Sequence, residues 1–229
     1  TVKTIAKRHG LYASFMPKPK YGMCGSGMHI NMSLFNKEGQ NIFVDENDKN
    51  GLSKEAYNFI AGLMKHMRSM TAIINPIVNS YKRLVPGYEA PTYIAWSATN
   101  RSPLIRVPAA RGLGTRVELR SPDCATNPYL AIAVCLAAGL DGIKNNLQPV
   151  ESIQRDIYSM TDEERDEAGI ENLPKNLYEA IQEMRKSDFV KGVLGKEVFK
   201  KYIKAKEEEW MEYTSQVTDW EIDRYLGRI

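Results

Sequence analysis

Five arginines lie within a twenty-residue stretch of this chain and surround a single glutamate. The arginines are Arg101, Arg106, Arg111, Arg116 and Arg120, and the glutamate is Glu118. Arginine presents a planar pair of donors that captures phosphate and carboxylate groups. The whole chain is near neutral, with 31 Lys and Arg against 28 Asp and Glu. So dense a cluster therefore predicts an anionic partner, either inside the fold or bound to it.

A second segment, residues 18–33, joins a glycine-rich turn to a histidine. Gly22, Gly25 and Gly27 flank Ser26, so the backbone of this turn can approach a ligand closely. The glycines alone are nonspecific, and their spacing is not that of a Walker A loop. Together the two segments indicate a site for a phosphorylated nucleotide and a carboxylate.

Two predicted strands each place specific polar side chains on one face. The alternating residues are His29, Asn31 and Ser33 within residues 28–35, and Arg116, Glu118 and Arg120 within residues 116–121. Period-two alternation puts such residues on the same side of a strand. The alternative is an ordinary solvated face, but solvated faces are typically rich in Lys, Thr and Glu. We therefore favour a sheet face that lines a ligand.

His29 and Glu118 form a candidate metal pair if these two strands are neighbours. One imidazole nitrogen and one carboxylate suit Mg²⁺ or Mn²⁺ better than Zn²⁺. Two ligands are too few for a closed site, so substrate phosphate, water or further residues must complete it. A hydrogen-bonded structural histidine is the alternative.

Residues 81–91 form a loop punctuated by proline and glycine, and they contribute Arg83 and Glu89. Arg83 joins the arginines that can divide between a substrate carboxylate and nucleotide phosphates, with internal salt bridges as the alternative. Glu89 places a carboxylate on a predicted lid. An ordinary exposed loop glutamate is the simpler interpretation.

Strong local signals set the elements around these residues. A long helix is predicted from the capping residue Ser53 to the stop at Asn75. An apolar run over residues 128–140 predicts a buried helix, and residues 11–15 predict a strand that follows a short N-terminal helix. The last third is predicted to be helical and highly charged, as a scaffold or subunit contact.

The composition is that of an ordinary globular chain of 229 residues, 43% hydrophobic and 26% charged, large enough for one domain or two. A net charge of +3 does not favour nucleic acid, whose binders usually carry a one-sided basic excess. No apolar run reaches membrane-spanning length. Cys24, Cys124 and Cys135 lack CxxC spacing, which indicates free thiols in a reducing compartment such as the cytoplasm. The first residues lack a signal peptide's apolar centre, and we expect the chain to begin inside a fold.

Five longer motifs follow one another along the chain. They are KPKYGMCGSGMHINMS, NSYKRLVPGYEAP, NRSPLIRVP, RVELRSPD and NPYLAIAVCLAAGLDGI. These motifs resemble the C-terminal half of type I glutamine synthetase, and the resemblance runs from Thr1 to Ile229. The short loop between Arg106 and Glu118 is similar to that of the alpha subtype.

This resemblance implies that residues 1–229 are the C-terminal part of the family's catalytic domain. The implied fold is α+β, with a mostly antiparallel curved sheet lining the active site and helices outside. The implied assembly is a dodecamer of two stacked six-membered rings.

In that family ATP phosphorylates glutamate to γ-glutamyl phosphate, and ammonia then displaces the phosphate. By resemblance, His29 and Glu118 hold a metal ion. Glutamate is contacted by Gly25, Arg83, Glu89, Arg101 and Arg120. The nucleotide is contacted by Asn31, Ser33, Arg101, Arg106 and Arg116. The expected catalytic residues are Arg101, which reaches the transferring phosphoryl group, and Glu89, which closes the site and accepts a proton from ammonium.

Three positions depart from the family's usual pattern. Cys24 stands where the family usually has asparagine, so the contact that this asparagine makes in the substrate loop is not expected to be the same here. Asn31 stands where other type I members have histidine, although the alpha subtype often has asparagine. Tyr158 lies near a tyrosine that the beta subtype adenylylates, but its surroundings differ, so that modification is not predicted.

Other functions stay open at this point. A ligase that joins glutamate to a polyamine or another amine would share the ATP and metal residues. A non-catalytic structural or regulatory member would have lost metal or phosphate ligands, which this sequence keeps. A nucleic-acid module is a more distant alternative. Because the family's N-terminal β-grasp domain and other metal-binding glutamates do not occur in this sequence, we expect the chain alone to be inactive and its parent protein to be active.

Overall fold

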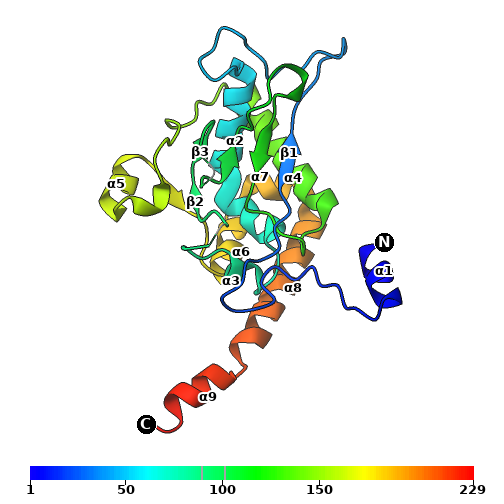
Figure 1. The fold of residues 1–229 in the computed structure, drawn as a ribbon, viewed down its shortest axis with the longest axis vertical. Coiled ribbons are helices and arrows are strands. Elements are labelled where there is room, and N and C mark those ends of the chain that lie inside the picture. Colours follow the sequence, from blue (N-terminus) through cyan, green and yellow to red (C-terminus); the bar gives the residue numbers. More distant parts are fainter. Residues whose placement is uncertain (89, 101) are drawn as a thin grey trace.

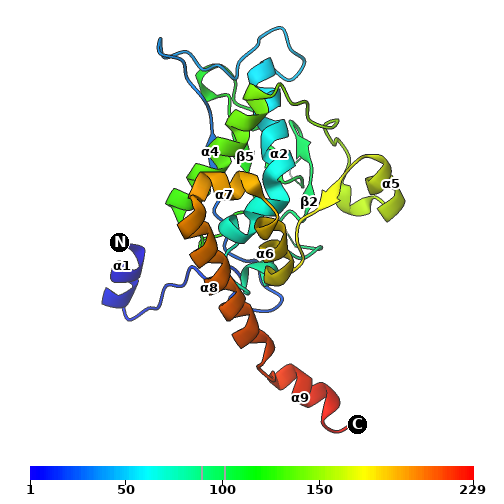
Figure 2. The same cartoon turned by 180° about the vertical axis from the view of Figure 1, so that it is seen from behind.

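The computed structural model describes residues 1–88, 90–100 and 102–229. Two long helices form its spine: α2 (Lys54–Ile74) and α4 (Pro128–Lys144) pack along one another. Helices α6 (Leu177–Arg185), α7 (Asp188–Leu194) and α8 (Lys196–Thr214) add to this layer. Figures 1 and 2 show the sheet on one side of the helical layer, so the fold is α+β, with helices outside the sheet.

The main sheet has four short strands in the order β1, β5, β4, β3. They span Ile30–Met32 (β1), Val117–Leu119 (β5), Ile105–Arg106 (β4) and Trp96–Ser97 (β3). β5 pairs antiparallel with β1 and with β4, whereas β3 and β4 are parallel. The sheet is therefore mixed: two of its three pairings are antiparallel, in line with the expected mostly antiparallel sheet, and one is parallel.

A second, two-stranded antiparallel sheet joins β2 (Tyr93–Ile94) to β6 (Glu171–Asn172). This pairing connects the segment before β3 to a projecting part of the chain, which we call the α5 arm. The α5 arm contains the 3₁₀ turn η2 (Ile157–Ser159) and helix α5 (Asp162–Glu167). Figure 1 shows this arm beside the main body. A small apolar cluster of Ala95, Ile157, Met160 and Ile170 fills the junction.

Helix α2 begins and ends where the sequence predicts. The Ser53 side chain accepts a hydrogen bond from the Ala56 amide, and the helix ends at Asn75 before a proline. Such capping satisfies backbone donors that the first turn leaves without a partner. The inner face is fully buried at Ile60, Leu63 and Met67.

Helix α4 also forms, capped by Asn127, but it is not buried all round. Its apolar residues Ile132, Leu136 and Leu140 are 55%, 40% and 46% exposed. Its buried side lies so close to α2 that a Cβ atom at Gly142 would be only 2.0 Å from the Asn58 carbonyl oxygen. Glycine at this position allows the two backbones to touch.

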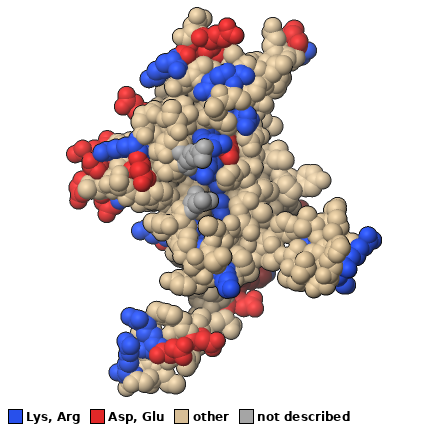
Figure 3. Space-filling model, in the orientation of Figure 1, with Lys and Arg blue, Asp and Glu red and all other residues tan. Residues whose placement is uncertain are grey.

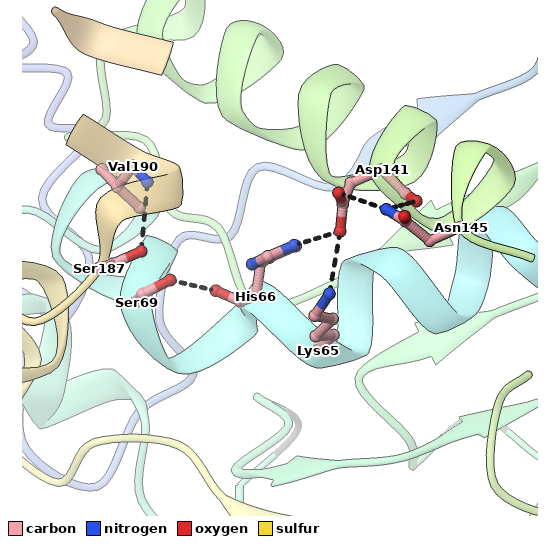
Figure 4. Close-up of polar contacts among 7 residues, drawn as sticks. All are labelled: Lys65, His66, Ser69, Asp141, Asn145, Ser187 and Val190. Atoms are coloured by element: carbon pink, nitrogen blue, oxygen red, sulfur yellow. Dashed lines mark hydrogen bonds and ion pairs between the residues drawn. The ribbon is translucent and has the colours of Figure 1, made fainter. Parts of the chain in front are cut away.

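A polar network spans the outer side of α2, α4 and α7 (Figure 4). The His66 Nε2 atom lies 2.8 Å from Asp141 Oδ2, and the Lys65 ammonium lies 3.2 Å from the same oxygen. The His66 ring also stacks on Phe189, with centroids 3.7 Å apart. The Asp141 carboxylate therefore links α4 to α2, and the stacked ring of Phe189 adds α7 to the same place.

The predicted strand over residues 11–15 is wrong. This segment has no strand pairing in the part of the chain that the structure describes, and Leu11 and Tyr12 are 67% and 92% exposed. The apolar pattern alone does not make a strand, because a strand also needs a partner. Helix α1 (Val2–Arg8), which precedes it, is present as predicted.

The C-terminal third is helical, as predicted. Two of its helices begin with capping boxes, formed by Thr161 with Glu164 and by Thr218 with Glu221. Helix α9 (Asp219–Tyr225) extends from the end of α8 away from the body (Figures 1 and 2). Among the described helices, none combines the length and the apolar character that a membrane span requires.

Candidate functional site

The turn of residues 22–27, helix α3 (Ser80–Arg83) and the end of β5 enclose a polar pocket of about 190 Å³. Its lining residues are Lys18, Cys24, Gly25, Gly27, His29, Arg83, Tyr88, Ala90 and Arg120. Figure 3 shows Lys and Arg side chains gathered in a band across this face. We call this space the arginine pocket. Its cationic lining suits a small anionic ligand.

Arg83 forms the floor of the arginine pocket and is only 5% exposed. Its Nη1 atom donates to the Ser121 carbonyl oxygen at 2.6 Å, and Nη2 donates to the Arg120 carbonyl oxygen at 3.3 Å. Burial lowers the pKa of the Arg83 guanidinium. Arg83 therefore brings a positive charge to the pocket while fixing the backbone at the end of β5.

The glycines of the turn are needed because the chain passes directly over Arg83. A Cβ atom at Gly25 would lie 2.2 Å from the Pro17 carbonyl oxygen, and one at Gly27 would lie 2.5 Å from Arg83 Nη2. The backbone of this turn therefore packs closely against other protein atoms, and its close approach to a ligand stays a prediction. Any larger side chain would push the turn away from Arg83.

Glu118 is the centre of a polar cluster on the sheet. The strand register sets Glu118 opposite Asn31 on β1 and opposite Arg106 on β4. The His29 Nδ1 atom lies 2.7 Å from Glu118 Oε1, and the Arg106 Nε atom lies 2.6 Å from Oε2. The predicted pairing of His29 with Glu118 across neighbouring strands is therefore present in the geometry.

Asn31 and Arg116 extend this cluster along the same face. The Arg116 Nε atom donates to Asn31 Oδ1 at 2.9 Å. Ser33 lies just past the end of β1 beside a separate, more apolar hollow that Ile132 and Leu136 of α4 also line. The alternating pattern thus placed Asn31 correctly, whereas the strand is too short to hold Ser33 on its ladder.

The arginines of the dense stretch separate into different surroundings. Arg120 lines the arginine pocket, and its Nη1 atom donates to the Pro103 carbonyl oxygen at 3.4 Å. Arg111 is exposed and donates through Nε to the Asn50 carbonyl oxygen at 2.8 Å, outside the pocket lining. Glu89 and Arg101, the two predicted catalytic residues, lie outside the described residues.

The sequence did not reveal Asp123, which is fully buried behind Arg83. Its carboxylate accepts hydrogen bonds from the Asn75 side chain and the Ala125 amide, each at 2.9 Å. Burial raises the pKa of Asp123, while the nearby Arg83 charge acts in the opposite direction. Lys18 and Tyr88 also line the arginine pocket, and no role was predicted for either residue.

The described residues supply two donors for a metal ion. In residues 1–88, 90–100 and 102–229, no group of three or more His, Cys, Asp and Glu side chains could hold one. His29 and Glu118 offer one nitrogen and one oxygen donor, the types predicted for the pair, and in this structure Nδ1 and Oε1 contact each other directly at 2.7 Å. Further ligands have to come from elsewhere.

Comparison with known proteins identifies the relationship. The family model described as glutamine synthetase, catalytic domain, matches residues 1–225. The chain belongs to the glutamine synthetase family. It is 62% identical over 227 residues to a glutamine synthetase of Clostridium saccharobutylicum, covering 99% of this chain and 51% of that protein. It is 58% identical over 228 residues to a glutamine synthetase of Methanosarcina mazei, covering 100% of this chain and 51% of the relative.

Solved structures agree with this family membership. A GmaS structure without ligand superposes with a TM-score of 0.86 at 40% identity, covering 98% of this chain and 50% of that one. A GmaS structure in complex with ADP gives a TM-score of 0.87 at 39% identity and covers 99% of this chain and 52% of that one. The chain thus spans about half the length of the glutamine synthetases that it matches.

Proposed function

We propose that the protein carrying this chain joins ammonia to glutamate at the expense of ATP, through γ-glutamyl phosphate, and so makes glutamine. The observation that carries the proposal is the juxtaposition of two sites on one face. The arginine pocket, with Arg83 and Arg120, suits a carboxylate, and the Glu118 cluster beside it suits phosphate and metal. Relatives named glutamine synthetase at 62% and 58% identity support the same reaction.

The proposed roles in glutamate binding follow the pocket lining. Gly25, Arg83 and Arg120 bind glutamate, with the Arg83 charge held in place by its two backbone carbonyl partners. Arg101 contacts glutamate and the transferring phosphoryl group. Glu89 closes the site and accepts the proton that ammonium releases.

Nucleotide binding is proposed for the polar face of the sheet. Asn31, Ser33, Arg106 and Arg116 would contact ATP, together with Arg101. Arg106 and Arg116 are supported by their fixed positions against Glu118 and Asn31. Phosphoryl transfer depends chiefly on positioning and on positive charge around the phosphates, which such arginines supply.

We assign His29 and Glu118 as ligands of a divalent cation, Mg²⁺ or Mn²⁺. When bound, the ion would neutralise negative charge on the ATP phosphates. Arg106 lies 2.6 Å from Oε2 of Glu118, while Oε1 lies on the side of His29, so the two groups that would hold the ion adjoin. These two residues are too few to complete a metal site, and we expect this chain alone to be inactive.

The wider biological setting is also proposed. The alpha subtype of type I glutamine synthetase, a dodecameric assembly of two stacked hexameric rings and a cytoplasmic location follow from the sequence resemblance. Helix α4 exposes an apolar stripe at Ile132, Leu136 and Leu140. Such a stripe supports an assembly in which another domain or subunit covers this helix.

The test is an assay of the protein expressed from its complete reading frame with ATP, Mg²⁺ and glutamate, comparing ammonium with a polyamine. Phosphate release and glutamine formation that depend on ammonium would support the proposal. Turnover with the polyamine alone would overturn the product, and no turnover with either acceptor would favour a non-catalytic member. Glutamine formation by residues 1–229 alone would contradict the expected inactivity of the chain.

A further inference from the structure

Arg111 is the one arginine of the dense stretch to which the proposed function gives no role. It lies among residues 108–115, which join β4 to β5 and include the 3₁₀ turn η1 (Gly112–Gly114). We call residues 108–115 the β4–β5 turn. The next residue along the chain is Arg116, the proposed nucleotide contact. The shape of this turn therefore decides where the Arg116 side chain starts.

The β4–β5 turn also holds the far end of the Arg116 side chain. Arg116 Nη1 donates to the Gly114 carbonyl oxygen at 3.1 Å, and Nε donates to Asn31 Oδ1 at 2.9 Å. The guanidinium is therefore set between η1 and strand β1. A shift of η1 would move the first acceptor and leave the second in place, so the guanidinium would lose its fixed direction.

Asn41 holds the β4–β5 turn from its buried side and is itself only 8% exposed. Its Nδ2 atom donates to the Thr115 carbonyl oxygen at 2.7 Å. The Gly112 and Leu113 carbonyl oxygens lie 3.3 Å and 3.4 Å from the same nitrogen. Buried carbonyl groups need a donor, and removing it leaves them without a partner. One amide group thus gathers three carbonyls of the turn.

Asn41 is fixed in turn by the core and by the chain that follows β1. Its Oδ1 atom accepts from the Phe43 amide at 3.0 Å. Phe43 is fully buried, and its ring lies against Phe59 of α2 with centroids 5.2 Å apart. The neighbouring Ile42 amide donates to the Leu34 carbonyl oxygen at 2.9 Å. The position of the Asn41 amide therefore does not depend on the turn that it holds.

Arg111 holds the β4–β5 turn from its exposed side. Its Nη1 atom donates to the carbonyl oxygens of Pro108 and Ala110, inside the turn. Its Nε atom donates to the Asn50 carbonyl oxygen at 2.8 Å, in the loop of residues 45–51. A Cβ atom at Gly51 would lie only 2.8 Å from the Arg111 side chain, so the turn and this loop are in close contact.

The loop of residues 45–51 is a firm support for Arg111 because it is tied to helix α2. Asp48 Oδ2 accepts from the Asn50 amide at 2.8 Å and from the Tyr57 hydroxyl at 2.7 Å. The Asn50 side chain also donates to the Tyr57 hydroxyl oxygen at 2.9 Å. Arg111 therefore connects the β4–β5 turn to a loop whose own shape is fixed by hydrogen bonds.

We propose that Asn41 and Arg111 are positioning residues that hold the β4–β5 turn so that Arg116 faces the nucleotide phosphates. The inference rests on the proposed function, in which Arg116 contacts ATP. A positive charge acts most strongly on a phosphate where its position is fixed in advance. Arg116 precedes β5, whereas Arg120 of the arginine pocket follows it. Loosening the turn should therefore affect the nucleotide and spare glutamate.

Separate KM values for ATP and for glutamate test this role in the protein from the complete reading frame. Asn41→Ala should raise the KM for ATP about tenfold, because it removes the donor of the buried carbonyls. Arg111→Met should raise it about threefold, since water can replace part of what an exposed donor supplies. The KM for glutamate should change by less than about twofold in both variants.

Asn58→Ala is the matched control for Asn41→Ala. Asn58 is likewise buried, at 2% exposed, and its Nδ2 atom donates to the Leu147 carbonyl oxygen beyond the end of α4. Both variants should unfold more easily, because each leaves a buried carbonyl without its donor. Only Asn41→Ala should raise the KM for ATP. A similar rise in Asn58→Ala would show that lost stability, and not lost positioning, is the cause.

A double-mutant cycle shows whether the effect passes through Arg116. Arg116→Gln should itself raise the KM for ATP about thirtyfold, and adding Asn41→Ala to it should change that value by less than about twofold. Effects that multiply, equal rises for both substrates, or an unchanged KM for ATP would overturn the positioning role. Should Asn41→Ala fail to fold, Arg111→Met, at an exposed site, still decides it.

ADP binding separates this inference from the proposed function. Titration calorimetry should give a weaker ADP affinity for Asn41→Ala and an unchanged one for Asn58→Ala. Equal affinities in Asn41→Ala and the unsubstituted protein would overturn the positioning role. An unsubstituted protein that makes no glutamine from ammonium would instead refute the proposed function, and the ADP affinities would still decide the roles of Asn41 and Arg111.

Discussion

The ion pairs of the Glu118 cluster and those of helix α8 join similar side chains, but the Glu118 carboxylate is buried whereas the α8 side chains are exposed to water. The Glu118 side chain is 7% exposed and lies 2.7 Å from His29 and 2.6 Å from Arg106. On α8, Lys201 and Glu197 lie 2.9 Å apart, but their side chains are 78% and 80% exposed. Water screens the second pair, so it contributes little, whereas breaking the first leaves charge without compensation in a buried place.

This contrast indicates where the molecule is sensitive to substitution. On the sheet side, strand register and burial fix each charged group, and the groups have few other partners. On the α8 side, each charge can exchange its neighbour for water. Substitutions that change charge should therefore affect function and stability mainly at the Glu118 cluster.

The largest effect is expected at Glu118. Glu118→Gln removes the charge that compensates Arg106 and weakens the proposed metal pair, so the catalytic rate should fall at least about a hundredfold. The free energy of unfolding should fall by about 3 kcal/mol. Steady-state kinetics and urea unfolding measure the two effects. Glu197→Gln on α8 is the control, and comparable losses in the two variants would refute the contrast.

The next largest effect is expected at Gly25. A methyl group there meets the Pro17 carbonyl oxygen at 2.2 Å, so Gly25→Ala should destabilise the protein by about 2 kcal/mol and raise the KM for glutamate. Gly192 on α7 is the matched control, because an added Cβ there meets nothing within 4 Å. Gly192→Ala should be neutral or slightly stabilising, since alanine favours helix. Equal melting temperatures for the two variants would contradict this account.

An intermediate effect is expected at Asp141. Its side chain is 26% exposed, which lies between the values for Glu118 and Glu197. The hydrogen bond with His66 lowers the pKa of Asp141, and Lys65 adds to this lowering while burial opposes it. Because the pKa of Asp141 is lower in the folded than in the unfolded protein, the ionised carboxylate stabilises the fold. This stabilisation is fully present at pH values above the ordinary carboxyl pKa of about 4. That stabilisation is lost as the pH falls through the lower folded value.

Asp141→Asn should therefore lower the free energy of unfolding by about 1 kcal/mol at neutral pH. The difference from the unsubstituted protein should shrink as the solution is acidified. Urea unfolding across the acid range measures this. A difference that stays constant with pH would show that the loss is one of packing, not of charge.

The smallest effect is expected for the exposed pairs of α8. Lys201→Ala should change the free energy of unfolding by less than about 0.5 kcal/mol, because both side chains of its pair are mostly in water. High salt should abolish what remains. A loss that persists in high salt would show that the α8 surface is less solvated than its exposure indicates.

Features that depend on local sequence were predictable. Ser53 and Asn75 set the ends of α2 because capping and helix termination are decided within a few residues. Period-two alternation placed Asn31 and Glu118 each on the polar face of its own strand, and the structure adds that the two strands are neighbours. Such signals need no knowledge of the rest of the chain.

Features that depend on distant partners were not predictable. Residues 11–15 have the pattern of a strand but no strand to pair with among the described residues. Lys18 belongs to a residue type that usually lies in water, and only Tyr88, Met23 and Asn79 together explain its burial. Asp123 likewise gives no sign in the sequence that it is buried behind Arg83.

The central claim is that this fold serves γ-glutamyl phosphate chemistry, and the fate of one oxygen atom tests it most directly. Glutamate labelled with heavy oxygen in its γ-carboxylate would be supplied with ATP and ammonium to the protein from the complete reading frame. The account predicts glutamine together with inorganic phosphate that carries one labelled oxygen, because that oxygen bridges the two groups in the intermediate. Unlabelled phosphate, released without glutamine, would show that ATP is only hydrolysed by water and would contradict the account.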